Sequence, residues 1–151
     1  MHRVLYQTPN SGDIDAGKQL QQVLEGLTQG LREEPLSIHS DIASVLLDVH
    51  QAIPLMLVAN ELLTNAFKHA FPVPQAGDTL TVRFVLEDDQ VTLEISDNGA
   101  GLPEGAADQE SLGMIIVATL TDQLNAALLL ENQPQGGTLA RVTFRKHAGF
   151  L

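Results

Sequence analysis

The chain has 151 residues, a net charge of −11 and no cysteine, and 44% of its residues are hydrophobic. This length suits one domain that buries roughly two-thirds of its unfolded surface. The absence of cysteine excludes disulfides, thiol catalysis and cysteine metal sites, and an acidic chain without basic patches is not expected to bind nucleic acid.

The sequence contains neither a signal-peptide pattern nor an apolar run of membrane length. We therefore expect a cytoplasmic domain that makes no direct contact with a membrane.

The first third of the chain predicts a helix followed by a short hairpin. Asp13 or Asp15 can cap a helix that runs to about Arg32, because apolar residues recur through it at helical spacing. Two short runs, residues 36–39 and 44–49, then predict the strands of the hairpin.

A second helix has Pro54 in its first turn and ends near Phe71. At about 100° per residue, its apolar residues fill one face. The other face carries amides, an acid, a base and an imidazole: Asn60, Glu61, Thr64, Asn65, Lys68 and His69. Asparagine and threonine are indifferent helix formers, so this face is predicted to line a site, with a plain solvated face as the alternative.

The next elements are a strand hairpin and a glycine motif. Residues 79–86 and 91–96 alternate apolar and polar side chains around an acidic turn, which predicts a hairpin. Asp97 directly follows the second strand. Gly99 and Gly101 come after it and would let the backbone pass close to a ligand, although this motif alone also fits a simple turn.

The last third predicts a loop, a helix and another hairpin. Residues 99–110 show no periodicity and are long enough to form a mobile lid. Residues 112–124 predict an apolar helix whose N-terminus suits phosphate. Residues 126–131 and 138–146 predict the final hairpin, which has two glycines before Thr138.

This order of elements predicts a two-layer α/β (α+β) sandwich. It would have a mixed, mainly antiparallel sheet with about three helices packed on one face.

In their order and spacing, these motifs resemble the N, G1 and G2 boxes and the terminal Gly-Thr of the ATP-binding catalytic domain of sensor histidine kinases. That domain has the Bergerat fold, shared with gyrase, Hsp90 and MutL. Residues 51–72, with His69 at the end of the N box, are typical of the HWE-like subgroup. The resemblance covers nearly the whole chain. It implies that residues 1–12 are the tail of a preceding dimerisation helix or a linker, and that residues 13–151 are the catalytic domain.

The resemblance assigns the nucleotide base to four residues. Asp97 matches the carboxylate that accepts the adenine amino hydrogen. Gly99 and Gly101 match the glycines that let the chain pass the base and hinge the lid. Thr138 matches the residue that supports the adenine side.

The resemblance also assigns residues to the metal and to the transferred phosphoryl group. Asn65 matches the amide that binds Mg²⁺, a metal that prefers oxygen ligands. Glu61 matches the residue that helps to polarise the incoming histidine. Lys68 would neutralise phosphate charge, and His69 would hydrogen-bond it.

Gly113, together with Leu112 beside it, matches the chain segment that meets the phosphates. Here the sequence departs from the family pattern, because the fuller second glycine box has more than one glycine. The Trp and Glu of strict HWE members are not evident. No phenylalanine lies between Gly101 and Gly113, so the F box is missing.

The function implied is transfer of the ATP γ-phosphoryl group to a histidine on a dimerisation domain absent from this chain. A response regulator would then receive the phosphoryl group on an aspartate. His2 is interpreted as incidental because a break at residues 10–12 follows it. The isolated domain is expected to be monomeric.

Three alternatives remain open. The chain could be a serine kinase of the anti-sigma-factor type, or a degenerate binding module of the same fold. The ATPase domain of a gyrase or Hsp90 relative is disfavoured by the length and by the N box.

Overall fold

The computed structural model describes residues 12–29, 36–101 and 112–147. Its strands form a five-stranded sheet and a separate two-stranded sheet. The larger sheet has the order β2 (Ser37–Ile42), β4 (Thr79–Glu87), β5 (Gln90–Asp97), β7 (Thr138–Arg145) and β6 (Ala127–Asn132). The smaller sheet pairs β1 (Ile14–Asp15) with β3 (Leu46–Leu47).

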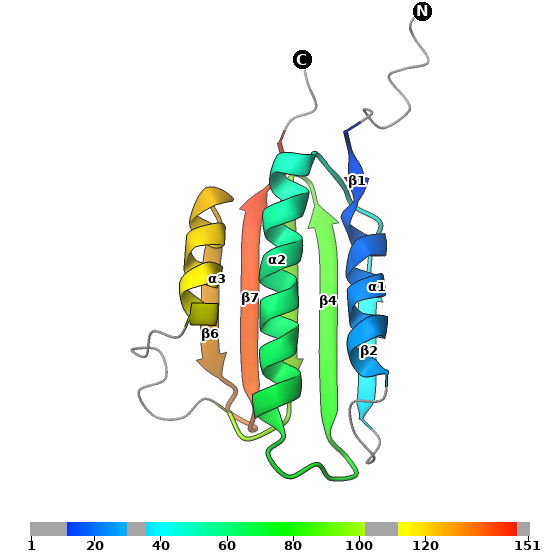
Figure 1. Cartoon of the computed structure of the whole chain (residues 1–151), viewed down its shortest axis with the longest axis vertical. Helices are drawn as coiled ribbons and strands as arrows, with labels where there is room; N and C mark the ends of the chain where they lie inside the picture. Colours follow the sequence, from blue (N-terminus) through cyan, green and yellow to red (C-terminus); the bar gives the residue numbers. More distant parts are fainter. Residues whose placement is uncertain (1–11, 30–35, 102–111, 148–151) are drawn as a thin grey trace, which may run out of the picture.

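Helices cover one face of the large sheet, as Figure 1 shows. They are α1 (Ala16–Thr28), α2 (Val49–Asn65) with its π-helical extension η2 (Ala66–Ala70), and α3 (Leu112–Gln123). The sheet is mixed because β2 runs parallel to β4, whereas the other pairs are antiparallel. The predicted two-layer sandwich is therefore confirmed.

The β4–β5 hairpin forms where the sequence pattern predicted it. Leu80, Val82 and Phe84 are buried beneath the helices, and the polar residues between them point to the other side. The register joins Glu87 to Gln90 across the turn, where Asp88 adopts a left-handed conformation with φ 55°. Alternation of period two thus places one face of each strand in the core.

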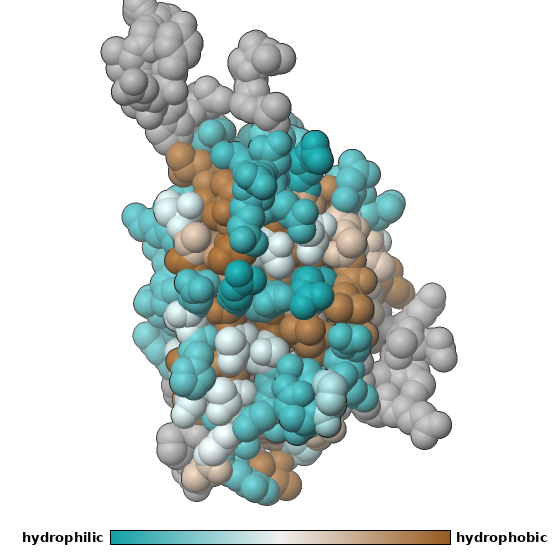
Figure 2. Space-filling model, turned by 180° about the vertical axis from the view of Figure 1, so that it is seen from behind, coloured by the Kyte–Doolittle hydropathy of each residue, from teal (hydrophilic) through white to brown (hydrophobic). Residues whose placement is uncertain are grey.

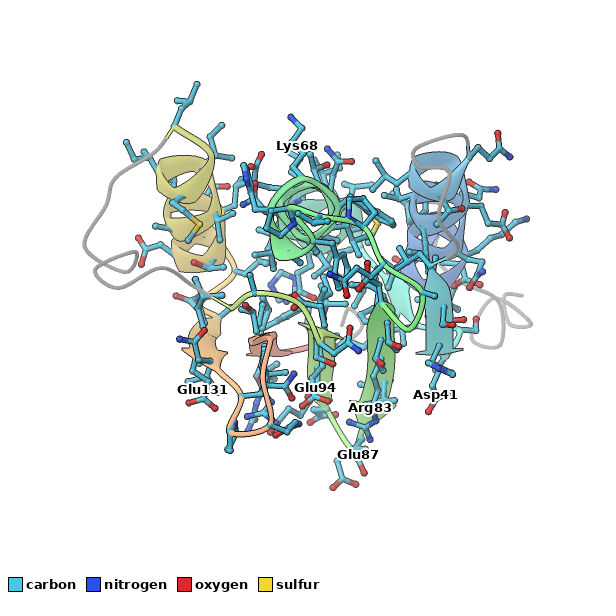
Figure 3. The ribbon with its side chains drawn as sticks, turned by 90° about the horizontal axis from the view of Figure 1, so that it is seen from below. Asp41, Lys68, Arg83, Glu87, Glu94 and Glu131 are labelled. Atoms are coloured by element: carbon cyan, nitrogen blue, oxygen red, sulfur yellow. The ribbon has the colours of Figure 1, made fainter. Side chains whose placement is uncertain are left out.

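The opposite face of the sheet is open and mostly polar (Figure 2). Asp41, Arg83, Glu94 and Arg141 are successive register partners on four neighbouring strands. Their charges alternate across the sheet, as Asp41, Arg83 and Glu94 show in Figure 3. Arg141 continues the row, with its Nε 2.6 Å from Glu94 Oε2. Because like charges never face each other directly, this row of side chains favours the observed register.

The predicted hairpin over residues 36–49 is wrong. β2 joins the edge of the large sheet beside β4, and β3 pairs with β1 instead. Val45 and Leu47 are 1% and 0% exposed, so this part of the chain enters the core beneath α1 rather than folding back on β2. Burial of these apolar side chains, which local pattern does not report, selects the partner strand.

The helix boundaries differ from the predicted ones in two places. Of the two predicted caps, Asp15 is the one that caps α1, by accepting a hydrogen bond from the Lys18 main-chain N–H. The helix ends at Thr28 and not near Arg32, because Gln29 is already extended, with ψ 120°.

The second helix begins earlier than predicted. Asp48 caps it by accepting from the main-chain N–H groups of His50 and Gln51. Pro54 therefore lies in the second turn instead of the first, where it cannot donate to the His50 carbonyl. The helix nevertheless continues to Asn65.

Gly17 brings α1 close to the segment before β3. A Cβ at this position would overlap the Ala43 carbonyl, whereas a Cβ on Gly26, in the same helix, would meet nothing. We expect Gly17→Ala to lower the free energy of unfolding by about 1–3 kcal/mol through overpacking. Gly26→Ala is expected to raise it by up to about 1 kcal/mol through helix propensity. Urea unfolding measures both, and a stabilising Gly17→Ala would contradict the close approach.

Candidate functional site

The predicted site residues gather at one end of the sheet, the lower end in Figure 1. Four structural features meet there: the C-terminal end of α2 with η2, the end of β5, the β6–β7 turn and the N-terminus of α3. Motifs that are far apart in the sequence therefore lie close together in the fold.

Asp97, the last residue of β5, is a buried carboxylate with an exposed fraction of 7%. Its Oδ1 accepts from the main-chain N–H of Gly99 at 2.9 Å and from that of Thr138 at 3.3 Å. Burial raises the pKa of Asp97 against the lowering effect of these two hydrogen bonds. Within the described part of the chain, none of the hydrogen bonds ends on Oδ2, which leaves this oxygen to accept from a ligand.

Gly99 joins the glycine motif to the end of the polar helix. A Cβ on Gly99 would overlap the Ala70 carbonyl oxygen, and the next residue, Ala100, donates its N–H to that same oxygen at 2.7 Å. Only glycine permits this approach of the two main chains. The end of η2 and the turn after β5 are thus fixed to each other.

Asn98 anchors the neighbouring loop to the same strand end. Its side-chain oxygen accepts from the Thr79 N–H at 2.7 Å, and its amide nitrogen donates to the Gly77 carbonyl at 2.9 Å. The loop before β4 is therefore held at the same end of the sheet as Asp97.

The β6–β7 turn places main chain against Asp97 from the other side. Gly137 has φ +89°, and a Cβ there would overlap the Asp97 main-chain oxygen. Gly101 has φ +80°, and a Cβ there would meet Asn132 at the end of β6. Both glycines adopt a conformation that other residues rarely take.

The end of α2 differs from the uniform helix that the sequence predicted. Residues 66–70 form a π-helix, a rare element that is frequent at functional sites. Its wider turn rotates each residue less than an α-helix does. Lys68 and His69 are therefore displaced from the arc expected with Glu61 and Asn65.

Glu61 and Asn65 are half-buried, whereas Lys68 and His69 are exposed. Figure 3 shows the Lys68 side chain pointing away from the sheet, on the outer side of its helix. No ion pair among the described residues involves Lys68. The structure thus brings Asp97, Gly99 and Thr138 into direct contact but leaves Lys68 apart from them.

Gly113 lies directly against Glu61. A Cβ on Gly113 would overlap the Glu61 carboxylate oxygen Oε2. Leu112 beside it is 74% exposed, and these two residues form the first turn of α3. The N-terminal main-chain N–H groups of α3 therefore lie next to the acid of the polar face.

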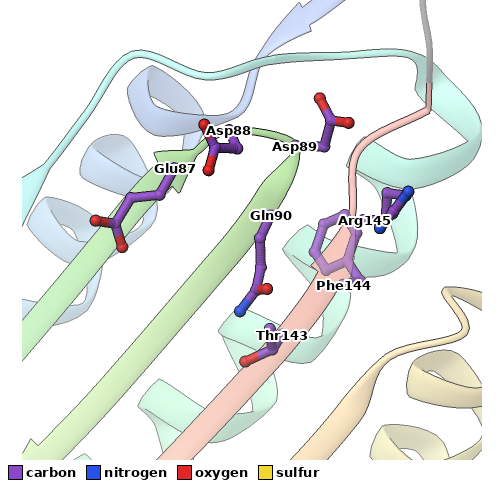
Figure 4. A pocket seen from close by; sticks show the side chains of 7 residues that line it. All are labelled: Glu87, Asp88, Asp89, Gln90, Thr143, Phe144 and Arg145. Carbon is purple, nitrogen blue, oxygen red and sulfur yellow. The ribbon is translucent and has the colours of Figure 1, made fainter.

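The predicted lid over residues 99–110 lies largely outside the described residues. Two hollows in the described part of the chain are lined by residues other than the predicted site residues. The larger, of about 360 Å³, lies at the β4–β5 turn, at the other end of the sheet (Figure 4). The smaller, of about 160 Å³, lies between α1 and α2.

Sequence reasoning missed Ala70, Asn98 and Gln133 as parts of this site. Ala70 contributes a main-chain carbonyl, which no side-chain pattern reports. Asn98 stood inside the recognised motif, and its place in an Asp-Asn-Gly turn was the available signal. Gln133 gave no local signal, because its partners are the main chains of Asp97 and Thr138.

Comparison with known proteins identifies the class. The family model described as histidine kinase-, DNA gyrase B-, and HSP90-like ATPase matches residues 50–148, and the chain belongs to this family. It is thus a histidine kinase-like ATPase domain, as its motifs indicated. The HWE subgroup is not distinguished by these matches and stays a prediction.

Among its relatives are two bacterial sensor proteins. The chain is 36% identical over 110 residues to the nitrate/nitrite sensor protein NarX of Escherichia coli K12. The aligned region covers 73% of this chain and 18% of NarX. It is 31% identical over 144 residues to the sensor histidine kinase PdtaS of Mycolicibacterium smegmatis, covering 85% of this chain and 27% of PdtaS. The chain therefore spans less than a third of either relative.

Solved structures share the fold. The histidine kinase domain of the blue-light activated histidine kinase of Erythrobacter litoralis EL346 superposes with a TM-score of 0.81 at 24% identity, covering 88% of this chain and 62% of that one. The ATP-binding domain of PrrB from Mycobacterium tuberculosis gives 0.65 at 24% identity, covering 91% and 97%.

None of the helices in the described segments has the length and apolarity needed to cross a membrane.

Proposed function

We propose that this chain is the cytoplasmic, Mg-ATP-binding catalytic domain of a two-component sensor histidine kinase. It transfers the γ-phosphoryl group of ATP to a histidine on a dimerisation domain outside these residues, from which a response regulator receives it. The proposal rests chiefly on the environment of the Asp97 carboxylate. Asp97 is a buried carboxylate whose Oδ1 is held by two main-chain N–H groups and whose Oδ2 is left to accept a hydrogen from adenine.

The main chain around Asp97 suits a flat base. Gly99 and Gly137 have no side chain and approach their neighbours so closely that a Cβ would overlap them. Thr138 donates its N–H to the same carboxylate that would meet the base. Buried, preoriented hydrogen-bonding groups of this kind favour one ligand over its analogues.

The donor set at the end of α2 suits magnesium brought with the nucleotide. No cluster of three His, Cys, Asp or Glu side chains with metal-ligand geometry occurs in the described segments. Mg²⁺ is usually held by one or two protein oxygens together with phosphates and water, so the amide oxygen of Asn65 would be its protein ligand. A magnesium ion bound there would neutralise phosphate charge.

The remaining residues of α2 and α3 would act on the phosphoryl group. Glu61 would help to polarise the incoming histidine, and the main-chain N–H groups at the N-terminus of α3, at Leu112 and Gly113, would meet the phosphates. Lys68 points outward from α2, where an approaching dimerisation domain would bring its histidine. His69 would hydrogen-bond phosphate. Catalysis would then consist mainly of positioning and charge stabilisation.

Calorimetric titration of ATP with and without Mg²⁺ tests this proposal. We expect Mg²⁺ to raise the affinity for ATP. In Asn65→Ala the factor by which Mg²⁺ raises this affinity should be about tenfold smaller, because one contact to a charged group is lost. His50→Ala, exposed at the other end of the same helix, is the control and should leave the effect of Mg²⁺ unchanged. No binding at millimolar ATP would refute the proposal and leave a degenerate binding module.

The nature of the acceptor is tested by incubating the domain and Mg-ATP with a separate dimerisation domain. We expect an acid-labile, alkali-stable phosphoryl group on that domain, as phosphohistidine has. An acid-stable product on serine would instead support the anti-sigma-factor type of kinase.

A further inference from the structure

Gln133 is the first residue after β6 and belongs to none of the recognised motifs. Its side-chain nitrogen Nε2 lies 2.9 Å from the main-chain oxygen of Asp97 and 3.4 Å from that of Thr138. Both partners are carbonyls, which accept but cannot donate, so only the NH₂ end of the amide fits here. Gln133 therefore joins the ends of two neighbouring strands.

The sheet needs such a donor at this position. The last register pair between β5 and β7 is Ser96 with Leu139, and the next would be Asp97 with Thr138. The Thr138 N–H, however, donates to the Asp97 carboxylate at 3.3 Å. The Asp97 main-chain oxygen thus lacks a strand donor, and the Gln133 amide takes that place.

The turn holds Gln133 in this position. Its own N–H donates to the Gly137 carbonyl at 2.8 Å, and its carbonyl accepts from the Gly136 N–H at 3.0 Å. These two bonds close the turn between β6 and β7. Because the main chain of Gln133 is held by these two hydrogen bonds, its side chain reaches Asp97 from a fixed position.

From these contacts we infer that Gln133 is a positioning residue for adenine recognition. Gln133 donates to the Asp97 main-chain oxygen, so the Thr138 N–H remains available to the Asp97 carboxylate. The Thr138 N–H holds Oδ1 in place, which fixes Oδ2 where it would meet the base. This inference rests on the proposed function, because it assumes that Asp97 binds adenine.

Loss of the amide has a defined consequence. Without a donor from Gln133, the Asp97 main-chain oxygen competes with the carboxylate for the Thr138 N–H. Oδ1 then keeps only its bond from Gly99, and the carboxylate is free to turn. Recognition of the adenine amino group weakens more than recognition of the phosphates.

The test compares Gln133→Met, which keeps the side-chain length but removes the donor, with the control Gln135→Met. Gln135 lies in the same turn, and its side chain bonds Gln133 Oε1 at 3.2 Å. Each protein is titrated with ADP and with inosine diphosphate, which carries a carbonyl in place of the adenine amino group. Hydrogen exchange of the Gly99 N–H, which donates to Asp97 Oδ1, is followed by NMR without nucleotide.

We expect Gln133→Met to weaken ADP binding about tenfold and inosine diphosphate binding much less, so that discrimination between them falls. Exchange of the Gly99 N–H should quicken in this variant, because the turning carboxylate no longer holds it, but not in Gln135→Met. Gln133→Asn, whose shorter side chain does not reach Asp97, should behave like Gln133→Met.

Equal weakening for both nucleotides, or unchanged discrimination, would overturn the inference, because a general loosening of the fold affects both alike. If the wild type bound neither nucleotide, the proposed function would fail, yet exchange of the Gly99 N–H would still decide the role of Gln133. Faster exchange confined to the Gln133 variants would support positioning of the carboxylate, and unchanged exchange would exclude it.

Discussion

Asp97→Asn is expected to weaken ATP binding by roughly a hundredfold or more without destabilising the domain. The asparagine side-chain oxygen can still accept from the Gly99 and Thr138 N–H groups. The new NH₂ group, however, takes the place of the oxygen that would face the adenine amino group. Two donors then oppose each other, and the base loses its partner.

Whereas Asp97→Asn should lower the affinity for ATP, it should not lower the stability of the nucleotide-free domain at neutral pH. Burial raises the pKa of Asp97, so the folded state favours the neutral carboxyl. The stability that this neutral form contributes is complete below the ordinary aspartate pKa of 3.8 and is lost as the pH rises through the raised value. At neutral pH the wild type therefore contains a buried charge that Asp97→Asn removes.

Thermal unfolding of the nucleotide-free domain across pH, alongside calorimetric ATP titration, measures both effects. We expect Asp97→Asn to be at least as stable as the wild type at pH 7 and to lose part of that difference toward acid. Asp41→Asn removes the same charge on the open face of the sheet and should leave ATP affinity unchanged. Affinity within threefold of wild type in Asp97→Asn would refute the assignment of adenine to this residue.

Gly137→Ala should be among the most destabilising single substitutions in this domain, lowering the free energy of unfolding by about 3–5 kcal/mol. Two effects combine at this position. Its φ of +89° strains any residue with a Cβ, and that Cβ would overlap the Asp97 main-chain oxygen. Since the clash displaces Asp97, ATP binding should also be lost.

Gly136 provides a matched control for the strain alone. It has φ +108° in the same turn, but a Cβ there would meet nothing. Gly136→Ala is therefore expected to lower the free energy of unfolding by only about 1–2 kcal/mol and to keep ATP binding. Chemical unfolding of both variants isolates the overlap as their difference, and equal losses would show that Gly137 does not touch Asp97.

Local sequence pattern determined much of the fold. The β4–β5 hairpin followed from alternation over residues 79–96 around an acidic turn, because period two places one face of each strand in the core. The apolar helix α3 and the last hairpin were also predicted at their places in the chain. The polar face of α2 and the glycine motif after β5 also indicated, by residue type and spacing, which family the chain belongs to.

Tertiary contacts decided the remainder. β2 pairs with β4 rather than with β3, because burial of Val45 and Leu47 directs the chain beneath α1. A hydrophobic pattern shows that a residue prefers the interior, but it does not show which neighbour will cover it. Likewise, the π-helix after Asn65 interrupts a pattern that reads as a uniform α-helix.

The same division holds within the candidate site. Through its resemblance to a family, the sequence by itself predicted which side chains bind ATP: a carboxylate at a strand end, helix amides and paired glycines. Only the tertiary structure decided that Gly113 lies against Glu61 and that Gln133 reaches the main chain of Asp97. These partners are distant in sequence. In addition, every residue has a main-chain oxygen, so residue type does not show which of them will accept a hydrogen bond.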